Sequence, residues 1–149
     1  MDPLYDSTLA PRILFTVIAT AIAIGPMIAD FNRTHATNPL WPPHARFHVV
    51  WQVLSQAGVS AVILYLLWVP SAAYGTHIWL AAFLNYVWGA SFYTTLASMS
   101  LFDGALKDVN GIKPFRFVIG GEEYLVDTNL FGGTILMIVN TIGVSLLLL

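Results

Sequence analysis

Four long runs without a charged residue or a histidine constrain this chain more than any other feature of its sequence. They cover residues 13–29, 49–76, 78–102 and 128–149. A helix of about 20 mainly apolar residues, or about 17 at the least, spans the hydrocarbon of a bilayer. Only 9% of the 149 residues are charged, against about 25% in soluble domains. The sequence therefore predicts an all-α membrane protein, a bundle of four transmembrane helices that forms a single integral membrane domain over residues 1–149.

The predicted helices cover about residues 13–29, 43–69, 73–100 and 131–149. We expect the first to be a permanent helix and not a signal peptide, because Asp2 and Asp6 stand where a basic flank would be needed. The second begins at Pro42-Pro43, since proline suits the first turn of a helix. Its short connection to the third helix predicts an antiparallel pair.

Residues 115–126, FRFVI-GG-EEYLV, predict a β-hairpin between the third and fourth helices, turning at Gly120-Gly121. Cross-strand pairing would put Arg116 on one face, diagonal to Glu123 and Asp127. The other face would be apolar and would carry Phe115, Phe117, Ile119, Tyr124 and Val126. We expect this face to lie over the mouth of the bundle or on lipid headgroups, because in water it would be a contiguous apolar patch.

The basic residues predict how the chain is oriented in the bilayer. Five of the six lie in the connections between helices one and two and between helices three and four, and only Arg12 lies on the other side. By the positive-inside rule, both connections and the hairpin are cytoplasmic and both termini are extracytoplasmic. Fourteen of the eighteen ionisable residues share that side, which concentrates the polar chemistry there.

The segment DFNRTHATNPLWPPHARFH, residues 30–48, is the richest polar stretch of the chain. Its seven candidate site residues are Asp30, Asn32, His35, Asn38, His44, Arg46 and His48. His44 and His48 are four residues apart and so share one helix face. That face continues to Gln52 and then to Ser55 or Gln56, and we expect it to point into the bundle, because polar groups in hydrocarbon are costly.

These residues suggest an acid–base site for a lipophilic substrate. Asp30, His35, His44 and His48 would converge on one cavity as catalytic groups, because the first helix ends and the second begins at the same membrane interface. In the first turn of the second helix, His44 is favoured as the neutral imidazole. Polar groups that would bind the substrate are Asn32, Asn38, Arg46, Gln52, Asn85 and Asn140. A divalent metal held by His35, His44, His48 and Asp30 is an alternative. In a further alternative, these residues only anchor helix ends at the membrane interface.

Composition excludes several other classes of function. The chain has no cysteine, which removes disulfides, thiolate metal sites and iron–sulfur clusters. With a net charge of −2, the chain lacks the excess of basic residues that is typical of nucleic-acid-binding proteins. We predict no organic cofactor, and the expected partners are the lipid bilayer, a lipophilic small molecule and, in one reading, other membrane subunits.

Residues 32–52, NRTHATNPLWPPHARFHVVWQ, resemble a family of small uncharacterised four-helix integral membrane proteins of bacteria and fungi, which implies this fold and no known activity. A looser likeness to the emopamil-binding-protein superfamily implies a sterol-like ligand and, in some members, isomerisation of a double bond. This chain departs from that pattern, with His48 and Gln52 where a His–Glu pairing would be wanted. The two readings are a membrane-embedded isomerase or cyclase, and a non-catalytic lipid- or pigment-binding or accessory subunit of a larger membrane complex.

Overall fold

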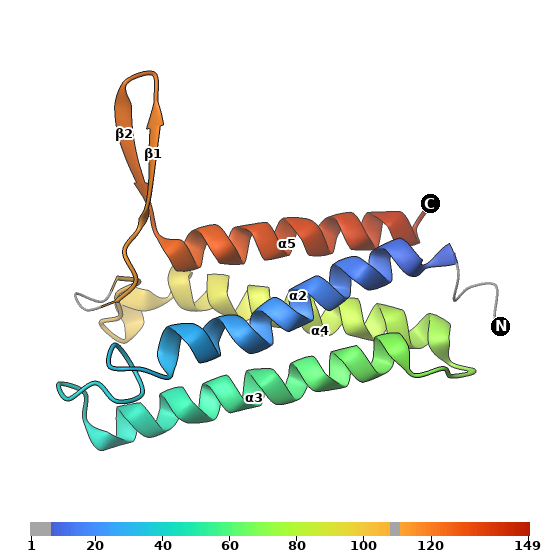
Figure 1. Cartoon of the computed structure of the whole chain (residues 1–149), viewed down its shortest axis with the longest axis horizontal. Coiled ribbons are helices and arrows are strands. Elements are labelled where there is room, and N and C mark those ends of the chain that lie inside the picture. The colour runs from blue at the N-terminus through green and yellow to red at the C-terminus, as the bar shows by residue number, and fades with distance from the viewer. Residues whose placement is uncertain (1–6, 108–110) are drawn as a thin grey trace.

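The computed structural model describes residues 7–107 and 111–149, and within them four long helices run side by side in alternating directions (Figure 1). The helices are α2 (Leu9–Asp30), α3 (Pro43–Trp68), α4 (Tyr74–Ala97) and α5 (Thr128–Leu147). A short 3₁₀ helix, η1 (Met99–Leu101), follows α4. Strands β1 (Phe115–Ile119) and β2 (Glu122–Val126) form a hairpin before α5. The predicted helical bundle with one hairpin is therefore present.

Three of these helices, α2, α3 and α5, are long and apolar enough to cross a membrane. Helix α4 has 24 residues but falls short in apolarity, because His77, Asn85 and several tyrosines and threonines interrupt its apolar residues. The chain is thus a membrane protein by the length and composition of three helices. The sequence had predicted four spans.

The helices pack in a ring in which α2 and α4 each contact both α3 and α5. Buried side chains in the half of the bundle that holds the α3–α4 turn include Phe15, Ile18, Ile63, Leu67 and Ile78. On the outside, large apolar side chains are exposed along all four helices, as expected of a surface that faces lipid. Of the cavities described below, one lies at the opposite end of the bundle and the others extend towards its middle.

Two helices begin earlier than the sequence predicted. Helix α2 begins at Leu9 and not at residue 13, because Pro11 lies in the first turn, where no backbone hydrogen bond is needed. Helix α5 begins at Thr128 and not at residue 131. The side chain of Asp127 caps it by accepting hydrogen bonds from the backbone N–H groups of Asn129 at 2.9 Å and Leu130 at 3.2 Å.

The hairpin has the predicted bounds and register. Phe117 pairs with Tyr124 across the strands, and Gly120 and Gly121 have φ of 61° and 87°, as a two-residue turn of type I′ requires. The hairpin extends across the direction of the helices (Figure 1) and its strands are almost wholly exposed. Phe115 at the start of β1 lines a cavity between α2 and α5, whereas the rest of the hairpin extends away from the helices (Figure 1). Contact of its apolar face with lipid headgroups stays a prediction.

Both long connections lie at the same end of the bundle, and the described part of the chain begins and ends at the other end (Figure 1). This agrees with the predicted grouping of polar residues at one end.

Candidate functional site

Asp30 and His35 form a polar pair where α2 ends. The loop after α2 folds back on the helix, with the Ala36 N–H donating to the Asp30 carbonyl at 2.9 Å. This brings His35 Nδ1 to 3.5 Å from Asp30 Oδ1 and to 2.7 Å from the Thr34 hydroxyl. The imidazole also packs edge-on against Trp41, with ring centroids 5.1 Å apart. Both members of the pair are about one quarter exposed, at 23% and 24%.

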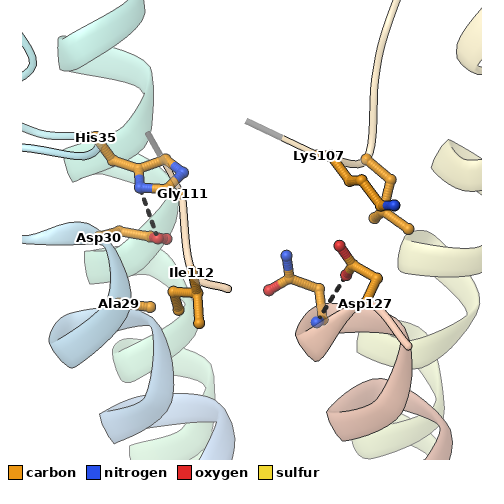
Figure 2. A pocket seen from close by; sticks show the side chains of 9 residues that line it. Ala29, Asp30, His35, Lys107, Gly111, Ile112 and Asp127 are labelled. Atoms are coloured by element: carbon orange, nitrogen blue, oxygen red, sulfur yellow. Dashed lines mark hydrogen bonds and ion pairs between the residues drawn. The ribbon is translucent and has the colours of Figure 1, made fainter. Parts of the chain in front are cut away.

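The pair lines a small cavity of about 60 Å³ at the mouth of the bundle (Figure 2). Lys107 and Asp127 lie across the gap from Asp30 and His35. This cavity therefore brings together acidic and basic groups from α2, the loop after it, the segment after η1 and the N-cap of α5. Lys107 and Asp127 were absent from the predicted site, although Asp127 before an apolar run is a recognisable helix-cap signal.

A second, mainly apolar cavity of about 430 Å³ adjoins the first and extends between α2 and α5. Its walls include Ile22, Gly25, Phe131 and Gly132. The two cavities share four lining residues: Ala29, Asp30, Ile112 and Asn129. A charged compartment thus lies next to an apolar one, and we call the two together the α2–α5 mouth.

His44 and His48 do not join this site. Their Nε2 atoms are 3.0 Å apart, both side chains are exposed, and their ring contacts are with Phe47 and Trp51 of the same helix. The four candidate catalytic groups therefore form two separate pairs and not one cluster. Among residues 7–107 and 111–149, no three His, Cys, Asp or Glu side chains are placed to hold a metal ion, so the four-ligand metal alternative is not assembled here.

Helix geometry explains why the polar stripe on α3 does not point inward along its length. Each step of four residues advances about 400° around a helix of 3.6 residues per turn, so the stripe drifts by about 40° per step. From exposed His44 and His48 it passes Gln52, also exposed, and reaches the interior only at Gln56 and Ser60.

The predicted substrate-binding amides have other contacts. Asn85 is buried and donates to the Phe15 carbonyl at 3.5 Å, and Asn140 is buried and donates to the Ala82 carbonyl at 3.1 Å. Both therefore join neighbouring helices, and neither lines the α2–α5 mouth.

Two more of the predicted polar residues hold the loop after α2, and two lie on α3. The Asn32 amide donates to the Ala29 carbonyl at 2.9 Å, and the Asn38 amide donates to the Thr34 carbonyl, also at 2.9 Å. Arg46 is half-buried near the start of α3. Gln52 lines a different cavity, between α3 and α4. A part in ligand binding remains a prediction for all of them.

Arg12 is a buried charge that the predicted site did not include. Its side chain is 3% exposed, and its guanidinium lies 4.4 Å from the centre of the Trp68 ring, a cation–π geometry. The sequence placed Arg12 at the edge of the first span and used it only to orient the chain. Because α2 begins at Leu9, Arg12 lies within a helix that could span a membrane, and a charge in such a helix is a signal for a buried, specific contact.

Comparison with known proteins assigns the chain to a family but does not give it an activity. A family of unknown function (DUF6640) matches residues 14–111, which include Asp30, His35 and Lys107 and end before the hairpin and α5. No curated protein and no solved structure matches the chain.

Proposed function

The chain belongs to a family of unknown function, and from the geometry of the site we propose that it binds an amphiphilic, lipid-like molecule at the α2–α5 mouth. The observation that carries this proposal is the set of residues shared by the charged and apolar cavities, Asp30 and Asn129 among them. A ligand with a small polar head and a hydrocarbon tail would complement both compartments at once. Small-molecule sites generally combine apolar walls with a few placed polar groups.

The charged compartment favours a head group that both donates and accepts hydrogen bonds. Asp30 and Asp127 offer carboxylates, whereas Lys107 offers an ammonium group. A single anion or a single cation would meet like charge on one side of this cavity. A zwitterionic or uncharged polar head satisfies both sides.

The proposal includes a bilayer location for the site. We propose that α4 also spans the membrane, since its 24 residues extend about 36 Å, against about 30 Å of hydrocarbon, and it packs alongside α3 and α5. The end that holds the α2–α5 mouth would face the cytoplasm, because five of the six basic residues belong to it. The apolar cavity would then take its ligand laterally from the cytoplasmic leaflet.

Acid–base catalysis at the same mouth is a second candidate. The observation that favours it is the Asp30–His35 contact of 3.5 Å in a cavity wall, since a carboxylate that orients an imidazole is a common acid–base arrangement. Such a pair could move a proton in an isomerase or cyclase reaction, as the likeness to the emopamil-binding-protein superfamily implies. His44 and His48 have no part in this version, because they lie outside both cavities.

The binding proposal is tested by closing the tail compartment. A leucine at Gly132 would occupy the apolar cavity, and a Cβ there meets nothing within 4 Å. In nanodiscs, a diazirine-bearing phosphatidylcholine should label peptides from α2 and α5 of the natural chain, and Gly132→Leu should reduce that labelling. Gly58→Leu is the control, since Gly58 on α3 also has open space and does not line this cavity.

Asp30→Asn tests the head compartment with the same probe. Hydrogen bonds to charged groups contribute about 1.5–3 kcal/mol. We therefore expect Asp30→Asn to need at least roughly ten times the probe concentration that gives the same labelling of the natural chain. Equal labelling of the natural chain and Gly132→Leu would overturn the site, as would an equal loss in Gly58→Leu. His35→Ala distinguishes catalysis from binding. This variant should still be labelled by the probe but should no longer convert co-purified lipid.

A further inference from the structure

A third cavity, of about 380 Å³, lies between α3 and α4 and does not belong to the α2–α5 mouth. Ile22 and Trp88 line both this cavity and the apolar part of the mouth, so the two spaces lie back to back across the bundle. Most of its exposed wall is apolar, with Ile63, Leu84 and Val87 among the lining residues. We call it the α3–α4 cavity.

Among the residues that the structure describes, five uncharged polar side chains line this cavity, and no charged residue does. They are Gln52, Ser55, Gln56, Ser60 and Ser91. Because a charged head group would find no counter-charge here, its desolvation would be uncompensated. The α3–α4 cavity therefore selects a neutral ligand, in contrast to the charged compartment of the mouth.

Two of these side chains have buried atoms without a hydrogen-bond partner in the described part of the chain. Ser60 is 1% exposed and its Oγ has none, and Gln56 Oε1 is likewise unpartnered. The two residues are four apart on α3, so their side chains are neighbours on one helix face. An unsatisfied buried polar group destabilises the fold by about 1–3 kcal/mol. A hydrogen bond from a ligand would remove this destabilisation.

The chemistry of these two atoms identifies the group they would bind. A glutamine Oε1 only accepts hydrogen bonds, whereas a serine hydroxyl can also donate. A ligand hydroxyl can donate to Gln56 and accept from Ser60 at the same time. We propose that the α3–α4 cavity binds a neutral lipid through a hydroxyl group, with its hydrocarbon lying against the apolar wall.

Paired photoreactive probes test this proposal on the full chain in nanodiscs. One is a diazirine-bearing long-chain primary alcohol, and the other is its methyl ether, which has the same length and no hydrogen-bond donor. The alcohol should label peptides covering residues 52–63 and 84–91, at about three to ten times the level given by the ether, as expected for one net hydrogen bond.

Ser60→Ala is the informative variant, because it removes the hydroxyl without filling the cavity. It should lower labelling by the alcohol about threefold to tenfold and leave the thermal midpoint of unfolding unchanged or raised, since it deletes an unpartnered buried group. Ser145→Ala on α5 is the matched control, since that hydroxyl already donates to the Thr141 carbonyl at 2.9 Å and lies outside the cavity. It should leave labelling unchanged.

Three results would overturn the proposal. Equal labelling by the alcohol and the ether would mean that acyl chains fill the groove without a polar contact. Unchanged labelling of Ser60→Ala would remove the hydroxyl contact. Rapid disulfide dimerisation of Val59→Cys in nanodiscs, in a chain with no other cysteine, would show that a second copy of the chain covers the cavity instead.

Discussion

Glycine and asparagine residues control how closely the helices of this bundle approach one another. Gly143 of α5 faces the ring of Phe15 on α2, and a Cβ built at that glycine would lie 2.5 Å from Phe15 Cε1. Small residues at such contacts allow close packing of membrane helices, where dispersion and hydrogen bonds replace the hydrophobic effect as the driving force. Asn140, one turn earlier on α5, adds a hydrogen bond to α4.

Gly143→Ala should therefore destabilise the fold. Phe15 is fully buried and cannot move aside freely, so overpacking should cost about 1–3 kcal/mol. The measurement is the free energy of unfolding in mixed micelles. Gly132→Ala on the same helix is the control, since a Cβ there has open space. Equal stability of the two variants would show that α2 and α5 do not pack as described.

Among the elements, the hairpin is best defined by sequence and the polar stripe on α3 least. Gly120-Gly121 between alternating strands specifies a turn locally, so the bounds, the register and the apolar face were all predictable. The stripe failed because its inward direction depends on how α3 is rotated against its neighbours. The same spacing begins at exposed His44 and ends at buried Ser60.

The hairpin's contacts with α5 show which of its faces is turned towards the helices. The rings of Phe115 and Phe117 pack on Phe131 in the first turns of α5, with centroids 4.9 and 5.7 Å apart. Their face is therefore turned towards the helices, whereas Arg116 and Glu123 form an ion pair on the opposite face. Because the hairpin extends across the helix direction (Figure 1), it would run parallel to the bilayer plane.

We predict that this apolar face lies in the headgroup region. A nitroxide on Ile119→Cys should show higher access to oxygen and lower access to a water-soluble nickel chelate than one on Val118→Cys, its neighbour on the opposite face. Electron paramagnetic resonance in nanodiscs measures both. Ile119 is 67% exposed and Val118 66%, so the protein itself buries the two side chains to the same extent. Equal accessibility of the two sites would contradict the predicted contact.

Across the whole molecule, one end of the bundle is filled and the other is open. The core of Phe15, Leu67, Tyr74 and Ile78 lies towards the α3–α4 turn, whereas the charged cavity of the mouth lies at the end with the long loops and the α3–α4 cavity lies near the middle of the bundle. The sequence predicted that most ionisable residues lie at the loop end, because the positions of charged residues along the chain can be read directly from the sequence. The sequence could not predict that Asp30 shares a cavity with Lys107 and not with His48, because that depends on loop conformation.

The arrangement of the chain across the bilayer is the last prediction, and it decides whether α4 spans. If all four helices cross, cysteines replacing Leu40 and Val118 should react with an impermeant maleimide from one side, and a cysteine replacing Ala72 from the other. If α4 does not cross, positions 72 and 118 would share a side. The positive-inside rule makes positions 40 and 118 cytoplasmic, so in intact cells only Ala72→Cys should be labelled. Labelling of Val118→Cys from outside would reverse the orientation and place the α2–α5 mouth in the outer leaflet.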